Sequence, residues 1–129
     1  MKLKQNRLAH EWFDRGQSDF QYAQAGQRET RRHHITCFLC HQAVEKILKG
    51  LIAGAGETPE KTHSLRGLLT QVQKLHPDLK WNEKGIRRLD AFYIPSRYPG
   101  PIQQDFIEKD ALEALEIAAQ ILEMLSLSP

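Results

Sequence analysis

The sequence predicts an all-α protein, an up-and-down antiparallel helical bundle of four long helices and one short helix, forming one domain over residues 1–129. Three observations predict this class. Apolar residues recur at helical spacing in nearly every segment, and no stretch of credible length alternates with the period of two that marks strands. Glycines and prolines gather at a few points that separate these segments. A chain of 129 residues is also long enough to bury one proper core.

The first helix is expected over about residues 8–25. Its apolar positions repeat along one face, with Trp12 beside them: Ala9, Phe13, Gly16, Phe20 and Ala23. Gly26 is a plausible C-terminal stop, so residues 27–32 are predicted to connect this helix to the next.

The second helix is expected over about residues 33–53 and is apolar on most of its sides. Its polar positions form one narrow stripe with the spacing i, i+3, i+4 and i+7, namely Gln42, Glu45, Lys46 and Lys49. A helix of this kind lies at the centre of a fold, covered by neighbouring helices or by a partner chain. We expect it to be the most buried helix.

The three remaining helices follow from their start and stop signals. Residues 54–59 form a loop, and residues 62–64 offer capping side chains for a short third helix from Leu65 to Leu75. Asn82 can cap a fourth helix, which must stop or kink near Pro95. The last helix is expected from about Gln104 to Leu125.

Composition and charge exclude some classes of protein and leave others open. The 18 basic and 16 acidic residues are too balanced to indicate a nucleic-acid-binding protein by themselves, although a local cluster can still bind phosphate. No apolar run approaches the roughly 20 residues of a membrane span. The N-terminus lacks the apolar region of a signal peptide, so we expect a cytoplasmic protein that does not insert into a membrane.

The only two cysteines, Cys37 and Cys40, are followed by His41 and so match the short CxxCH pattern of haem attachment. Both fall on the apolar side of the second helix, where free cysteines pack as small hydrophobic residues. A zinc site on one helical face, from His33, Cys37 and His41, is the stronger alternative, but a second ligand cluster is missing. We therefore expect no disulfide, no cofactor and no metal, and keep zinc as an alternative.

The run from Tyr93 to Pro101 holds three prolines, two tyrosines and Arg97 in nine positions. The structural interpretation makes Arg97 a tie between helices that pairs with Asp19 or Glu45. The functional interpretation makes it a ligand-binding residue on a stiffened loop. The polar stripe likewise has a structural interpretation, a solvated face with an ion pair between Glu45 and Lys49.

Several short motifs together resemble the HEPN family of small helical, nucleotide-associated domains. They are Ser18–Ala23, His41–Ile52, Thr62–Leu65, Leu89–Asp90 and Tyr93–Pro99, and the resemblance spans about residues 8–125. It implies an up-and-down bundle that commonly dimerises, with the end of the penultimate long helix at a shared cleft. In the ribonuclease members an arginine at that place is followed by a histidine after four to six intervening residues. Arg97 matches the arginine, whereas Ile102, Gln103 and Gln104 stand where the histidine should be.

The resemblance is greatest to members that are encoded beside a minimal nucleotidyltransferase, as its substrate-binding subunit or in a toxin–antitoxin pair. It implies a nucleotide- or RNA-binding homodimer, or a heteromer with such a partner. The alternatives are a metal-independent ribonuclease toxin whose base is displaced to His63 or His41, and a purely structural interaction protein. Arg97 is the expected principal phosphate contact, because its guanidinium is always charged and forked. The other expected site residues are Tyr98, Lys46, Lys49, Glu45, Gln42, His63 and Asp19.

Overall fold

The computed structural model describes residues 2–100 and 105–127, and of residues 2–6 only the backbone. These residues form five helices and no strand: α1 (Lys2–Thr30), α2 (His33–Gly54), α3 (Leu65–Leu75), α4 (Glu83–Arg97) and α5 (Glu108–Met124). The all-α prediction is confirmed. Within the described residues, no helix is long and apolar enough to cross a membrane.

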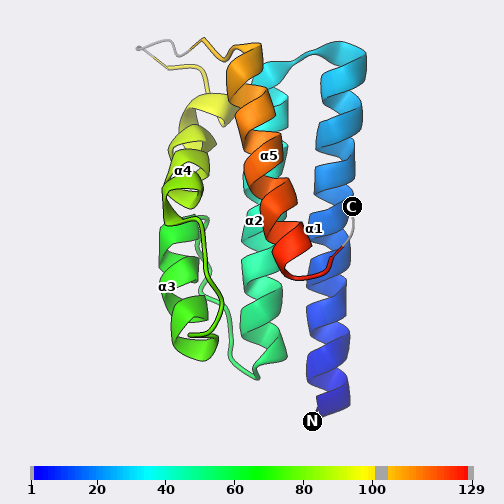
Figure 1. The fold of residues 1–129 in the computed structure, drawn as a ribbon, viewed down its shortest axis with the longest axis vertical. Helices are drawn as coiled ribbons and strands as arrows, with labels where there is room; N and C mark the ends of the chain where they lie inside the picture. Colours follow the sequence, from blue (N-terminus) through cyan, green and yellow to red (C-terminus); the bar gives the residue numbers. More distant parts are fainter. Residues whose placement is uncertain (1, 101–104, 128–129) are drawn as a thin grey trace.

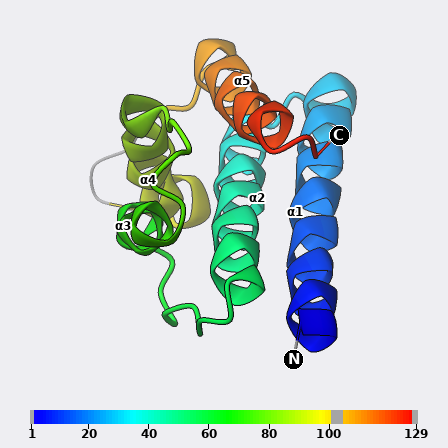
Figure 2. The ribbon, with the colours of Figure 1, turned by 60° about the horizontal axis from the view of Figure 1, so that its bottom comes forward.

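Helix α2 lies at the centre and packs against all four other helices (Figures 1 and 2). Helix α1 runs along one side of it, the pair α3 and α4 lies on the other, and α5 crosses between these two sides. Twelve residues of α2 are buried, so the prediction of a central, most buried helix is confirmed. The sequence left open whether neighbouring helices or a partner chain cover this helix. The neighbours cover nearly all the apolar side chains of α2, and Ile35 is its one large hydrophobic residue with high exposure.

The predicted end of the first helix is incorrect, because α1 continues past Gly26 to Thr30. The buried side chain of Gln27 explains the extra turn. Its Oε1 accepts a hydrogen bond from Thr36 Oγ1 at 2.8 Å, and its Nε2 lies 2.9 Å from His33 Nδ1. These contacts with α2 hold the last turn in place, and the connection shrinks to two residues. Arg31 makes the turn with a φ of 54°, in the left-handed region.

Close contact between α1 and α2 depends on Gly16. A Cβ atom placed there would lie 2.8 Å from Ile47 Cδ1 and 3.0 Å from the backbone oxygen of Ala43. The predicted apolar face of α1 is therefore confirmed as the packing face, with Phe20 and Ala23 fully buried beside it.

The predicted starts of α3 and α4 are confirmed by their caps. Ser64 Oγ accepts a hydrogen bond from the N–H of Gly67, and Asn82 Oδ1 accepts one from the N–H of Gly85. The last helix, in contrast, begins later than predicted. Gln104 lies outside the described residues, and residues 105–107 are not helical. The backbone N–H of Ile107 donates to Asp110 Oδ2 at 3.0 Å, which fixes the start of α5 at Glu108.

Candidate functional site

Arg97 is the last residue of α4, and Pro95 lies inside the final turn rather than ending the helix. The expected stop therefore comes two residues late. Proline removes one backbone donor, but the turn is closed in two other ways. Ser96 Oγ donates to the carbonyl oxygen of Tyr93 at 3.1 Å, and the N–H of Tyr98 donates to the carbonyl oxygen of Ile94 at 2.9 Å. The helix end is thus well defined where Arg97 projects from it.

The guanidinium of Arg97 is surrounded by aromatic rings. Its central carbon lies 5.2 Å from the ring centre of Tyr98, 5.7 Å from that of Tyr93 and 5.8 Å from that of Phe38. One nitrogen donates to the Tyr93 hydroxyl at 2.5 Å. Within the described part of the chain Arg97 makes no ion pair with a carboxylate, so most of its donors remain available.

Arg97 lines a groove of about 610 Å³, which we call the Arg97 groove. Residues 94–100 form one side of it, His34 at the start of α2 another, and Asp105 and Phe106 before α5 the third. The histidine expected from the resemblance would fall at Ile102, Gln103 or Gln104, which lie outside the described residues. His34 is the histidine that the structure places at the same groove as Arg97.

Tyr93 is the centre of a further cluster beneath Arg97. Its ring stacks with His63 at 5.3 Å between centres, lies 4.5 Å from the ring of His41, and stacks with Phe38 at 6.1 Å. Both histidines that were considered as displaced bases therefore contact Tyr93, whose hydroxyl accepts a hydrogen bond from Arg97. We name these five residues, Phe38, His41, His63, Tyr93 and Arg97, the Tyr93 cluster.

Asp90 anchors the cluster from the adjacent turn of α4. Its Oδ1 lies 3.2 Å from Nε2 of the fully buried His41 and accepts from the N–H of Leu65 at 3.0 Å, while Oδ2 accepts from the N–H of Arg66. Burial by itself would raise the pKa of Asp90. The hydrogen bonds from His41, Leu65 and Arg66, with the charge of His41, outweigh this and hold the pKa of Asp90 below its ordinary value. Asp90 thus caps α3 and ties α2, α3 and α4 together.

The polar stripe of α2 does not gather around Arg97. Glu45 is buried and pairs with Lys49 at 3.1 Å and with His63 at 3.1 Å. Lys46 pairs with Asp19 at 2.6 Å, on the side of α2 that faces α1. The predicted pair of Glu45 with Lys49 is confirmed. The structural interpretation of Arg97 is wrong, because neither Asp19 nor Glu45 pairs with it.

Of the predicted site residues, Arg97 and His63 belong to the Tyr93 cluster, and Tyr98 lies beside Arg97. Glu45 contacts His63, and Gln42 contacts His41. Lys46, Lys49 and Asp19 do not line the Arg97 groove. Sequence reasoning considered His41 only as a displaced base or a zinc ligand, and it missed His34, Phe38, Asp90 and Tyr93 as site residues. Helical spacing carries the signal that would have found them. Asp90, Tyr93 and Arg97 fall at i, i+3 and i+7 on α4, and they face residues of α2 at similar spacing.

The alternative zinc site is not assembled. His33 faces Gln27, and His41 faces Asp90 on the other side of α2. Both cysteines are buried, and burial raises the pKa of Cys37 to about 12 and that of Cys40 even further, so both thiols stay protonated. Across the described residues, no three His, Cys, Asp or Glu side chains are placed to hold a metal ion.

The fold and the site together place this chain among small all-helical domains. In this chain an arginine lies among aromatic rings at the end of the penultimate helix. The HEPN domain family matches residues 9–127, and the chain belongs to this family. No curated protein matches the sequence.

Two solved structures resemble the chain along nearly its whole length. TT1696 from Thermus thermophilus is 27% identical, with a TM-score of 0.75 over 92% of this chain and 95% of that one. ST0689, an archaeal HEPN homologue, is 25% identical, with a TM-score of 0.68 over 92% of this chain and 94% of that one.

Proposed function

We propose that this HEPN protein is a one-domain, cytoplasmic, nucleotide- or RNA-binding subunit that works with a minimal nucleotidyltransferase, as in toxin–antitoxin pairs. It forms a homodimer, or a heteromer when the partner is present. The observation that carries the ligand-binding part is the state of Arg97. Its guanidinium makes no ion pair with the described carboxylates, lies near three aromatic rings and lines a groove, so it offers phosphate oxygens a charged fork beside aromatic faces for a base.

Each of the predicted site residues has a role in this proposal. Arg97 contacts the phosphate through two of its nitrogens. Tyr98, whose side chain is about half exposed, stacks on the base. Gln42 positions His41, and His63 positions Tyr93 by stacking on its ring. Glu45 in turn holds His63. Lys46 and Lys49 act only as a weak background field, because Asp19 and Glu45 already neutralise them.

The substitution Arg97→Lys tests ligand binding. Lysine keeps the charge and loses the fork, so affinity for ATP and for a short single-stranded oligoribonucleotide should fall by about 1–3 kcal/mol, or roughly 5- to 150-fold. The melting temperature should not change. Arg87→Lys, on the same helix and outside the Arg97 groove, is the matched control and should bind as the wild type does. Equal affinities for Arg97→Lys and wild type would contradict the proposal.

The partner is tested separately. A minimal nucleotidyltransferase encoded next to this gene should co-purify with the tagged chain when both are expressed together. If the adjacent gene encodes such a nucleotidyltransferase and that protein elutes without the tagged chain, the partner part of the proposal fails while the ligand part stands. Sedimentation of the chain alone should show a dimer at micromolar concentration, and a monomer there would contradict the homodimer.

One observation favours the ribonuclease as a second candidate. His34 lines the same groove as Arg97 and is exposed, so it can take the proton from a 2′-hydroxyl while Arg97 holds the phosphate. Cleavage of RNA by the pure protein, lost in both His34→Asn and Arg97→Ala, would establish this function. If the pure protein binds neither RNA nor nucleotide and does not cleave RNA, a purely structural interaction protein is the remaining alternative.

A further inference from the structure

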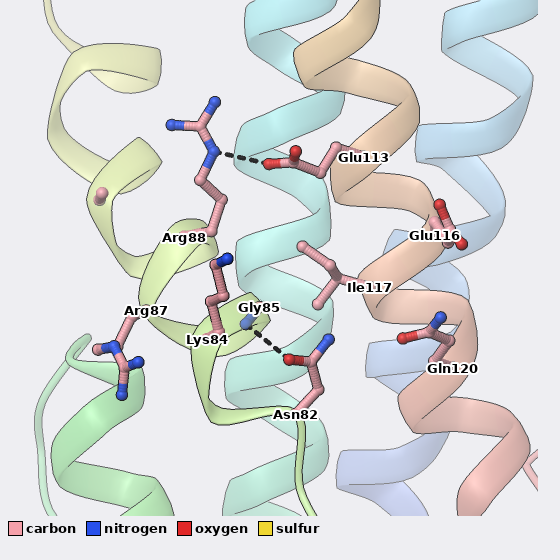
Figure 3. A pocket seen from close by; sticks show the side chains of 10 residues that line it. Asn82, Lys84, Gly85, Arg87, Arg88, Glu113, Glu116, Ile117 and Gln120 are labelled. Carbon is pink, nitrogen blue, oxygen red and sulfur yellow. Dashed lines mark hydrogen bonds and ion pairs between the residues drawn. The ribbon is translucent and has the colours of Figure 1, made fainter.

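Helices α4 and α5 contact each other less than any other packed pair in the described residues, although both pack against α2. Between them lies a groove of about 740 Å³, with α2 behind it (Figure 3). We call it the α4–α5 groove. Among the described residues it shares no lining residue with the Arg97 groove, so its occupant is a separate question.

The floor of the α4–α5 groove is small and apolar. Gly85 and Ile117 are buried there, and a Cβ atom at position 85 would lie 3.2 Å from Ile117 Cγ1. At one end Arg88 joins the two helices, with Asp110 at 3.0 Å and Glu113 at 2.6 Å. This bridge connects the two walls at that end of the groove.

The two walls carry exposed charges of opposite sign. Lys84 extends along the α4 wall, and Glu116 lies on α5 opposite it, whereas Arg87 is directed toward α3 (Figure 3). In the part of the chain that the structure describes, neither Lys84 nor Glu116 makes an ion pair or a side-chain hydrogen bond. The nearby Arg88 and Glu113 neutralise each other. One edge of the groove is therefore basic and the other acidic.

The shape favours a helix over a small molecule. The lining residues on α4 run from Asn82 to Ala91, a length of about 14 Å at the helical rise. The groove is open rather than closed, whereas small-molecule sites enclose most of their ligand. A trough between two helices with a third behind it accepts another helix at ordinary packing distance.

We propose that the α4–α5 groove is the docking site for an amphipathic helix of about three turns from a partner protein. The helix carries small apolar residues toward Ile117, carboxylates on the edge that faces Lys84, and cations on the edge that faces Glu116. This is the helix-in-groove mode of recognition, with edge charges that select the partner and its direction. The inference goes beyond the proposed function and does not depend on ligand binding at Arg97.

Three labelled synthetic helical peptides of about 15 residues test the groove. All share one apolar seam. The mixed peptide has glutamates along one edge and lysines along the other, and the two uniform peptides have glutamates or lysines on both edges. Fluorescence anisotropy should show that the wild-type protein binds the mixed peptide about tenfold more tightly than either uniform one, because each uniform peptide meets one wall of like charge.

Charge reversal then identifies the walls. Lys84→Glu makes both walls acidic, so the protein should prefer the all-lysine peptide, and Glu116→Lys should prefer the all-glutamate peptide. The double variant Lys84→Glu/Glu116→Lys exchanges the two walls. It should bind the mixed peptide again, because a helix laid in the opposite direction presents its edges the other way round. Lys61→Glu, an exposed charge outside the groove, is the matched control and should behave as the wild type.

Four results would overturn the proposal. These are no binding of any peptide, equal binding of all three, single reversals that do not change the preference, and a double variant that fails to recover the mixed peptide while its melting curve is normal. Filling the groove with Ala91→Trp should abolish binding of the mixed peptide. If Ala91→Trp instead converts a dimer into a monomer in sedimentation, the occupant is a second copy of this chain, which also contradicts the proposal.

Discussion

Two arginines on the same helix, nine residues apart, have opposite surroundings. Arg88 forms ion pairs with Asp110 and Glu113, and its guanidinium carbon lies 4.6 Å from the ring centre of Phe92. Its charge therefore joins α4 to α5. Arg97 lies near three aromatic rings, donates to the hydroxyl of Tyr93, and makes no ion pair with a carboxylate of the described residues. The residue type is the same, but Arg88 lies within α4 and Arg97 ends it, on the opposite face of the helix. The difference lies in what the neighbouring helix presents, and it separates a structural cation from one left free for a ligand.

Asp90 lies between the two arginines, and its loss should have the largest effect on stability. Asp90→Asn removes the charge that accepts from His41, Leu65 and Arg66, so the free energy of unfolding should fall by about 2 kcal/mol, or roughly 8 °C in melting temperature. Thermal melting at pH 7 measures it. Asp78→Asn, an exposed aspartate in the loop before α4, should leave the melting temperature within about 1 °C of the wild type.

The same carboxylate predicts an acid-sensitive stability. Because the pKa of Asp90 is lowered in the folded state, its stabilisation is fully present above its ordinary pKa of about 3.9 and is lost as the pH falls through the folded pKa. The wild type should therefore lose stability in that acidic range more steeply than Asp90→Asn. Parallel curves for the two proteins would show that Asp90 does not contribute.

Arg88→Met should cost about 1 kcal/mol of unfolding free energy, because two partly exposed ion pairs and one cation–π contact are lost. Affinity for nucleotide should stay the same. Its neighbour Arg87, exposed and outside any ion pair in the described residues, offers the control Arg87→Met, which should stay within about 0.5 kcal/mol of the wild type. Urea denaturation of the wild type and the two variants measures this. Equal midpoints for all three would show that Arg88 does not stabilise the fold.

Tyr93→Phe tests what orients Arg97, the second of the two arginines. It keeps the ring that stacks with His63 and removes the hydroxyl that accepts from Arg97. If this bond orients the guanidinium toward a phosphate, affinity for ATP should fall by about 0.5–1.5 kcal/mol with the melting temperature unchanged. Tyr22→Phe, on exposed surface of α1, is the control. Unchanged affinity in Tyr93→Phe would mean that the stacked rings alone hold Arg97.

The smallest expected effect on stability belongs to Arg97→Met. Since Arg97 is exposed and makes no ion pair with the described carboxylates, the free energy of unfolding should change by less than about 0.5 kcal/mol. A loss as large as that of Arg88→Met would erase the distinction between the two arginines and make both of them structural.

The sequence by itself determined the helices and the centre of the fold. Apolar periodicity located α2 and its buried face, and Ser64 and Asn82 marked helix starts, because caps and amphipathic faces are local properties of the chain. It also singled out Arg97. Where a helix end depends on another helix, sequence reasoning failed. Gln27 extends α1 only because Thr36 and His33 contact its amide, and no local pattern around Gly26 contains that information.

Tertiary structure alone decided which of the distant charges cancel. The sequence does not say which of the cations Lys46, Arg88 and Arg97 meets a carboxylate from another helix. Packing brings a carboxylate from another helix to each of the first two and aromatic rings to Arg97. The cluster of Tyr93 with His41 and His63 has the same origin, since three separate segments of the chain must meet before these rings touch. A side chain's charge is a property of the sequence, whereas its availability to a ligand depends on what lies within about 4 Å of it in the folded chain.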